Sequence, residues 1–238
     1  GIRDRSPSRG LGDVYKRQTH SYSVRLTDEK LEWLRKDLAT VDKQTPVFVG
    51  MHVPLHKTPT LDDTGRTTTS YNMEDAERFV ECLEGYDVNI LTGHTHYNFN
   101  ITKSERLREH NIAAVCATWW WTGHTDYAGN HICRDGSPGG YKIFEATGSD
   151  VRWYYKSIGK DAGYQFRTYD LNECLLEKSD FCPSASDSDF AKYAFGYDRA
   201  NDNNEVLINV FDWADDWKIE VTDLSDDSSL AVQRVRTH

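Results

Sequence analysis

The 238-residue sequence predicts an α/β fold, and three observations lead to that prediction. Two short apolar runs, 47–51 and 88–91, have the length and composition of buried strands. A segment with helical spacing of apolar residues precedes each run. Further along, short segments with alternating polarity are separated by turn residues. The order helix–strand–helix–strand is typical of folds with parallel strands, and the later segments indicate an antiparallel continuation or a second packed sheet.

The first predicted helix begins after Thr27, which is expected to be its N-cap. Acidic residues follow in the first turn, where the helix dipole favours them. One face of this helix is apolar, and it consists of Leu31, Leu34 and Leu38. Asn72 is the expected N-cap of the second helix, which Gly85 should end. Its expected apolar face consists of Met73, Ala76, Phe79, Val80 and Leu83.

The later strands are expected in two groups. Strands are predicted in the ranges 98–103, 112–117, 141–146 and 151–156, and then 164–169, 206–211 and 217–222. The second group indicates a small β-sandwich-like module. We therefore divide the chain into a basic leader without apolar periodicity (1–18), expected to be non-native or disordered, a main domain (19–158) and a C-terminal module (159–238).

The net charge of −10 argues against some partners. An acidic chain does not suit binding to a phosphate backbone, so no nucleic acid is expected as a structural partner. No run of 18 apolar residues occurs, so no transmembrane segment is expected. The five cysteines contain no Cys-x-x-Cys pair, and pairing of Cys116 with Cys133 and of Cys174 with Cys182 stays open. Nothing in the sequence indicates the oligomeric state.

Histidines follow both predicted buried strands. His52 comes directly after the first strand, and Gly93-His-Thr-His96 comes after the second. Open α/β sheets bind ligands at the carboxyl ends of their strands, and neutral imidazole is the commonest metal ligand near pH 7. On a turn after Gly93, His94 and His96 can reach two neighbouring ions. A single loop histidine is usually only polar surface, but the paired arrangement of His52, His94 and His96 favours a metal site.

Two motifs, Met51-His52-Val-Pro-Leu and Gly93-His-Thr-His96, resemble the last two metal-binding motifs of calcineurin-like metallophosphoesterases. This resemblance implies the C-terminal half of a metallophosphoesterase α+β sandwich flanked by helices, followed by a small all-β module. It implies that His52 and His94 share one ion and that His96 binds the other. The cofactors would be two divalent transition metal ions, Zn, Mn or Fe. The reaction would be hydrolysis of a small phosphomonoester or phosphodiester substrate by a bridging hydroxide.

Further segments resemble a Bacteroidota-type subgroup with a β-rich C-terminal module, which implies a bacterial protein of the periplasm or cell surface. These segments are His110–Cys116, Thr118-Trp-Trp120, Cys133–Pro138, Gly140-Tyr141 with Trp153–Lys156, and Asn209–Trp217. The motifs Asp-x-His, Gly-Asp-x-x-Asp and Gly-Asn-His-Asp/Glu do not occur here. We therefore expect a C-terminal fragment, inactive alone, whose parent supplies the bridging aspartate and the general-acid histidine.

Other residues are candidates for a substrate pocket. Trp120 and Asp135 both follow the site strands. Trp120 is one of three consecutive tryptophans, and Asp135 belongs to a Gly-rich loop. Packing between domains is the alternative for the tryptophans. His56 either lines the pocket or is a solvated loop residue, and His124 and His131 are further candidates. Trp213 and Trp217 belong either to module packing or to a carbohydrate platform. The second hypothesis for function is therefore a non-catalytic envelope module that binds a surface ligand, with a vestigial metal site.

Overall fold

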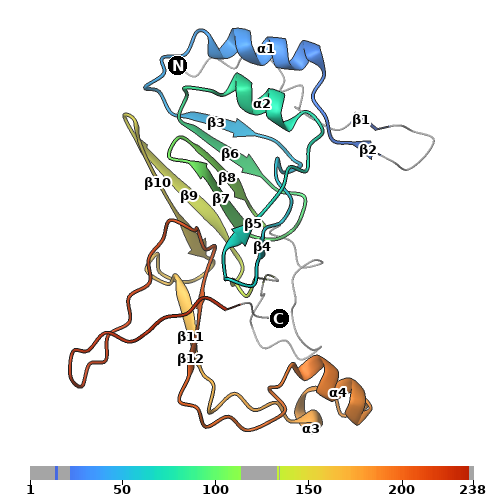
Figure 1. The fold of residues 1–238 in the computed structure, drawn as a ribbon, viewed down its shortest axis with the longest axis vertical. Helices are drawn as coiled ribbons and strands as arrows, with labels where there is room; N and C mark the ends of the chain where they lie inside the picture. Colours follow the sequence, from blue (N-terminus) through green and yellow to red (C-terminus); the bar gives the residue numbers. More distant parts are fainter. Residues whose placement is uncertain (1–13, 16–21, 114–132, 134, 236–238) are drawn as a thin grey trace.

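A four-stranded sheet lies at the centre of the protein (Figure 1). The computed structural model describes residues 14–15, 22–113, 133 and 135–235. The sheet has the order β3-β6-β8-β7. Strands β3 (Val47–Gly50), β6 (Val88–Thr92) and β8 (Leu107–Asn111) are parallel, and β7 (Phe99–Ser104) is antiparallel to β8. The predicted α/β class is confirmed, and β3 and β6 are the two predicted apolar strands.

Two helices cover one face of this sheet, α1 (Asp28–Leu38) and α2 (Ala76–Cys82). The Thr27 hydroxyl accepts a hydrogen bond from the Lys30 amide at 3.4 Å, which confirms the predicted N-cap. The core between helices and sheet is apolar, and it includes Leu31, Leu34, Leu38, Phe79, Val88 and Ile90. Burial of each such side chain contributes about 1.5–3 kcal/mol, as an upper estimate. This packing fixes the helices against the sheet.

The predicted start of the second helix is wrong. Helix α2 begins at Ala76, after Asp75, and Asn72 does not cap it. Instead, the Asn72 amide N–H donates to the Leu55 carbonyl at 2.8 Å, and its side chain donates to the Pro54 carbonyl at 3.2 Å. Asn72 therefore ties the segment before α2 to the loop that follows β3.

A hairpin covers the other face of the sheet. It consists of β9 (Gly140–Thr147) and β10 (Asp150–Ser157), and it confirms two predicted strands. Phe144 of the hairpin meets Phe48 of β3 edge to face, with ring centroids 5.7 Å apart. His110 of β8 packs edge-on against both Phe144 and Trp153. The sheet is therefore the middle of three layers.

Strand β8 was not among the predicted strands, and the strand predicted at 112–117 stays a prediction. The structure places β8 at Leu107–Asn111, and residues 114–117 are outside the described part of the chain. The reason is that Glu109, His110 and Asn111 are polar but are at most 1% exposed. A search for apolar periodicity does not find a strand whose buried side chains are polar.

The C-terminal region contains β11 (Phe166–Asp170) and β12 (Val206–Val210), which pair antiparallel as expected. Helices α3 (Lys178–Phe181) and α4 (Asp187–Ala194) lie in the connection between these strands and were not predicted (Figure 1). The strand expected at 217–222 does not form, and within it Thr222 makes a single bridge with Ser229. The division of the chain at residues 158 and 159 stays a prediction.

Short pairs of strands occur near the N-terminus and in the long loop after β3. Strands β1 (Val14–Tyr15) and β2 (Tyr22–Ser23) pair, so two residues of the expected leader belong to a strand pair. In the loop, β4 (Thr60–Leu61) pairs with β5 (Thr67–Thr68).

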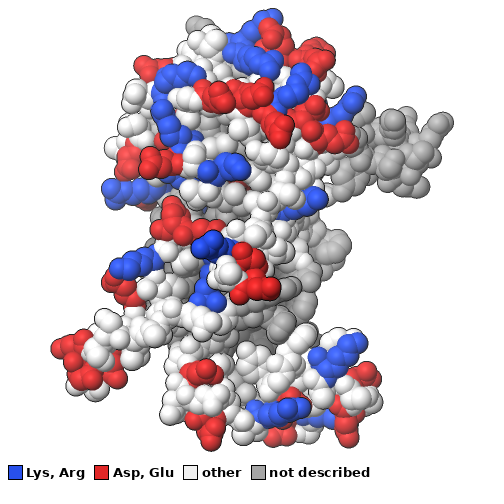
Figure 2. All heavy atoms as spheres, viewed as in Figure 1, with Lys and Arg blue, Asp and Glu red and all other residues white. Residues whose placement is uncertain are grey.

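Cys133, Cys174 and Cys182 are free thiols, so the pairing of Cys174 with Cys182 left open above is not formed in the structure. Cys116 lies outside the described residues. Within the described ranges, no helix has both the length and the apolar character that crossing a membrane requires. Basic and acidic side chains are intermixed on the face shown in Figure 2.

Candidate metal centre

His52 and His94 meet where the parallel strands β3 and β6 end. Their nitrogens His94 Nδ1 and His52 Nε2 are 3.2 Å apart, and the two rings are nearly perpendicular, at 78°. The loops behind them are joined, because the Gly93 amide donates to the His52 carbonyl at 3.0 Å. Both histidines are exposed to solvent. The structure therefore brings together two of the three predicted metal ligands.

The backbone of the second loop is a turn rather than an extended strand. His94 has a φ of 66° and His96 a φ of 61°, and both values lie in the left-handed region. The Thr95 amide donates to the Gly93 carbonyl at 2.7 Å and tightens the turn. Left-handed backbone at a non-glycine residue costs about 1–3 kcal/mol and tends to occur at functional sites. The expected turn after Gly93 is present.

The His52–His94 pair fits one metal ion. Two imidazole nitrogens bound to a tetrahedral zinc at about 2.0–2.1 Å would lie about 3.3 Å apart. The observed separation of 3.2 Å is close to that value, and in the structure the two nitrogens share a hydrogen bond that a metal ion would replace. Nevertheless, no group of three or more His, Cys, Asp or Glu side chains able to hold a metal occurs among the residues that the structure describes. The pair supplies part of a ligand set.

His96 lies beside a turn in which Cys133 is hydrogen-bonded to Gly136 and Ser137. Its carbonyl accepts a hydrogen bond from the Cys133 thiol, with 3.5 Å between sulfur and oxygen. Within this turn the Cys133 amide donates to the Ser137 carbonyl at 2.7 Å, and the Ser137 hydroxyl donates to Asp135 Oδ2 at 2.6 Å. Burial, reinforced by Asp135, raises the pKa of the Cys133 thiol to about 12. Cys133 is therefore a neutral donor that fixes the backbone near His96.

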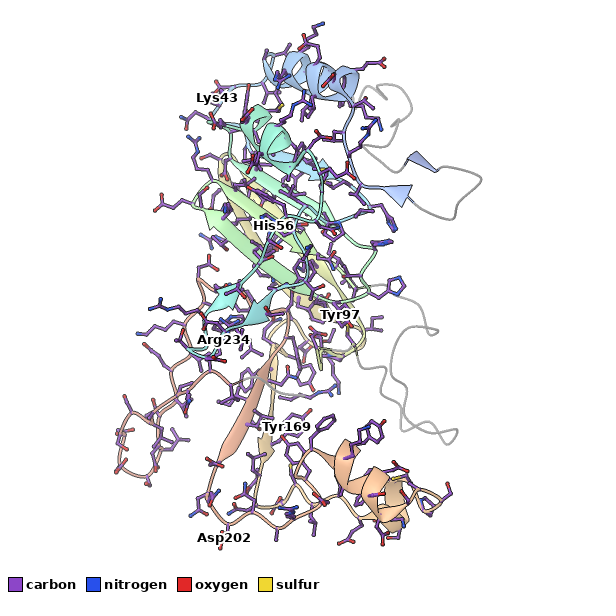
Figure 3. All side chains as sticks on the ribbon, turned by 45° about the vertical axis from the view of Figure 1, so that its right-hand side comes forward. Lys43, His56, Tyr97, Tyr169, Asp202 and Arg234 are labelled. Atoms are coloured by element: carbon purple, nitrogen blue, oxygen red, sulfur yellow. The ribbon has the colours of Figure 1, made fainter. Side chains whose placement is uncertain are left out.

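His56 occupies neither of the positions expected for it. His56, labelled in Figure 3, is 3% exposed, and its Nδ1 lies 2.7 Å from Oε2 of the buried Glu109. The ring also packs on Tyr71, with centroids 4.9 Å apart. The physical reason is the carboxylate of Glu109, which gives the imidazole a buried partner. His56 is therefore part of the interior rather than of a pocket wall or a solvated loop.

Asp135, the other candidate in the described residues, lines a cavity of about 200 Å³. The cavity lies between the sheet and the C-terminal region, and its lining includes Asn98, Asn100, Trp213, Asp215 and Arg234. Arg234 pairs with Asp215 there at 2.6 Å. Trp120, His124 and His131 lie outside the described residues.

The tryptophans of the C-terminal region pack against one another. Trp217 stacks on Trp153 of β10, with ring centroids 5.0 Å apart and planes at 25°. Trp213 meets Trp217 edge to face at 6.2 Å. Of the two interpretations of Trp213 and Trp217, the structure favours packing of the C-terminal module over a carbohydrate platform.

A buried polar network, absent from the sequence predictions, joins the sheet to the hairpin. His110 Nδ1 lies 2.8 Å from Asn100 Oδ1, and His110 Nε2 lies 3.1 Å from Asn89 Oδ1. Lys142 of β9 donates to the same Asn100 oxygen at 2.6 Å and pairs with Asp212. Burial, with the nearby Lys142 and Arg108 charges, lowers the pKa of His110 to about 3. His110 is therefore a neutral structural histidine.

A comparison with known protein families identifies the family of this chain. Residues 109–237 match the family model described as the C terminal of calcineurin-like phosphoesterase. The chain belongs to the calcineurin-like phosphoesterase family. The matched region begins inside β8 and covers the hairpin, Asp135 and the C-terminal region. No significant match was found among curated proteins.

For a calcineurin-like phosphoesterase, the site geometry and the family match cover different parts of the chain. His52, His94 and His96 precede the matched residues 109–237, whereas Asp135 lies within them. The matched region nevertheless contacts the histidine loops directly, through Glu109 and Cys133. The family is a hydrolase family that typically depends on metal ions, and His52 and His94 lie 3.2 Å apart at neighbouring strand ends.

Proposed function

We propose that this region forms part of a dinuclear metal centre that hydrolyses phosphomonoesters or phosphodiesters. His52 Nε2 and His94 Nδ1 would bind one divalent transition ion, Zn, Mn or Fe, and His96 would bind the second. The single observation that supports this most is the 3.2 Å separation of the two nitrogens at neighbouring strand ends. The family match supports the hydrolytic class.

The role of these side chains is to hold positive charge beside a phosphoryl group. Bound divalent ions stabilise the phosphoryl oxygens and make water a better nucleophile. The imidazole nitrogens of His52 and His94 would be the metal ligands on this side of the site, and imidazole is the commonest metal ligand of this kind. His94 and His96 stand two residues apart on a turn, so one short loop serves both positions.

Further ligands are needed for a complete centre. The described residues supply histidines, and divalent zinc or manganese centres usually include a carboxylate or water as well. We propose that the parent protein supplies the carboxylate ligands, through the motifs that do not occur in this chain. On its own, this chain should bind a transition ion weakly through its histidines.

Metal binding by the isolated chain tests the assignment. Titration of the metal-free chain with Co²⁺, followed by visible absorption and calorimetry, should show binding that His52→Ala and His94→Ala each remove. His110→Gln is the matched control, because His110 is buried in the polar network and should leave Co²⁺ binding unchanged. Binding that persists in both alanine variants would contradict the assignment.

A further inference from the structure

Two buried side chains of β8 lie under the loops that carry the candidate metal ligands. Glu109 and Asn111 are 1% and 0% exposed, respectively, and they stand two residues apart. Residues two apart on a strand point to the same face of the sheet. His110, between them, points to the other face and contacts the hairpin. One face of β8 is therefore polar beneath the site.

Glu109 holds the loop after β3. Its Oε1 accepts a hydrogen bond from the Leu55 amide at 2.8 Å, and its Oε2 accepts one from the His56 amide at 3.1 Å. The His56 ring, at 2.7 Å from Oε2, adds a third contact to this loop. Hydrogen bonds to a carboxylate are stronger than those between neutral groups. A single side chain thus fixes the backbone three and four residues beyond His52.

Asn111 holds the loop after β6. Its side-chain amide donates to the Thr95 hydroxyl at 2.5 Å and to the Tyr97 carbonyl at 2.6 Å. These two acceptors alternate with His94 and His96 along the loop. The left-handed turn at both histidines is therefore braced from the sheet by one side chain.

Thr92 links the two braces. Its hydroxyl lies 3.2 Å from Glu109 Oε1 and 3.0 Å from Asn111 Oδ1, at the end of β6 just before Gly93. A displacement of Glu109 would be transmitted to both loops, because Thr92 contacts both side chains and Gly93 is hydrogen-bonded to His52. An aliphatic side chain would fill the same space but would leave the Leu55 and His56 amides without this acceptor.

We infer that Glu109 is a positioning residue of the metal centre, with Asn111 and Thr92 as its partners. Its carboxylate fixes the loop of His52 relative to the loop of His94. It thereby sets the distance between the two nitrogens that would bind the metal ion. This inference rests on the proposed function, because it assigns Glu109 a role toward His52 and His94 as metal ligands. Residues that orient metal ligands typically change metal affinity by about 10- to 100-fold when substituted.

The experiment compares Co²⁺ binding and amide hydrogen exchange in the full chain and its variants. Glu109→Gln should weaken the binding that depends on His52 and His94 by about 10- to 100-fold and alter the Co²⁺ absorption spectrum. It should also speed exchange of the Leu55 and His56 amides. Thr92→Val, which keeps the branched shape, should weaken binding in the same direction by a smaller factor. It serves as the test if Glu109→Gln does not fold.

A matched control separates positioning from general loss of stability. His110→Gln changes the neighbouring buried side chain of β8 and should leave Co²⁺ affinity, the spectrum and the exchange of Leu55 and His56 as in the wild type. Two outcomes would overturn the proposed function and the positioning role together. One is a Co²⁺ affinity that both His52→Ala and His94→Ala leave unchanged, and the other is a wild-type chain that does not bind Co²⁺ at all. Histidine-dependent binding that Glu109→Gln and Thr92→Val leave within twofold would overturn the positioning role alone.

Discussion

Lys142 Nζ lies 3.0 Å from Asp212 Oδ1, and neither side chain is exposed to solvent. Lys142 belongs to β9, and Asp212 follows β12, so the pair joins the hairpin to the C-terminal region. Asn100 of β7 contacts both partners, because its oxygen accepts from Lys142 and its amide donates to Asp212 Oδ1 at 3.0 Å. The central sheet, the hairpin and the C-terminal region are therefore connected through one buried ion pair and the Asn100 side chain.

Removal of one charge from this pair should destabilise the protein strongly. Asp212→Ala would leave the Lys142 ammonium buried without a counter-charge, and breaking a buried pair in this way typically costs about 3–5 kcal/mol. Urea unfolding followed by fluorescence would measure the free energy of unfolding. Arg152→Ala, at the exposed pair with Asp150, is the control and should change it little. If the two substitutions changed the free energy of unfolding equally, burial would not determine how strongly the Lys142–Asp212 pair affects stability.

The pKa of His110 predicts a loss of stability in acid. Burial lowers the pKa to about 3 in the folded state, whereas the unfolded chain takes up the proton near 6.5. The folded state therefore binds fewer protons between these values. The stability contribution of neutral His110 is complete above pH 6.5 and is lost as pH falls toward 3, at up to about 1.4 kcal/mol per pH unit.

The difference between wild type and His110→Gln isolates this effect. Urea unfolding at pH 7, 6, 5 and 4 should show the stability advantage of the wild type shrinking as pH falls. Burial raises the pKa of Asp212 from its ordinary value of 3.8 to about 6, despite the attraction of Lys142. Asp212 therefore gives a slope of the opposite sign between about pH 3.8 and pH 6. That slope is common to both proteins and cancels. A difference that stays constant with pH would contradict the depressed pKa of His110.

The sequence predicted those parts of the fold in which polarity and burial agree. Val88 and Ile90 are apolar and buried, so β6 was found within one residue, and Thr27 capped α1 as expected. By contrast, Glu109 and Asn111 are polar and buried, because partners from distant loops satisfy them. Such partners are not visible in the local sequence, so both β8 and the hydrogen bonds that support the loops of the candidate metal site were missed.

A local signal for one missed element was present. The Ser186 hydroxyl accepts from the Asp189 amide at 3.1 Å and caps α4, and this spacing of serine and acidic residue is typical of a helix start. For the site, the positions of His52 and His94 after two predicted parallel strands were sufficient to predict that these two side chains meet, whereas the place of the His96 side chain stays a prediction. These positions did not predict that His56 would turn inward, because that depends on Glu109, 53 residues away.

At Gly140 the backbone lies so close to the opposite strand of the hairpin that there is no space for a side chain. A Cβ atom at this position would lie 2.6 Å from the Lys156 carbonyl oxygen and 2.6 Å from the Tyr155 ring. Gly140→Ala should therefore lower the free energy of unfolding by about 1–3 kcal/mol, the usual cost of overpacking. Gly163→Ala is the control, since a Cβ there meets nothing within 4 Å. Thermal unfolding followed by circular dichroism would compare them, and equal melting temperatures would argue against the close contact.

The left-handed backbone at His94 predicts that stability and metal binding respond differently to substitution. Glycine adopts a φ of 66° without the steric penalty that alanine meets there. His94→Gly should therefore be more stable than His94→Ala by about 1 kcal/mol. Both variants lack the imidazole, so both should lose the Co²⁺ binding expected of the His52–His94 pair. Urea unfolding and Co²⁺ titration of the same samples would measure the two effects. If alanine proved as stable as glycine, residue 94 would carry no backbone strain, and the strained turn would no longer support a functional role for this loop.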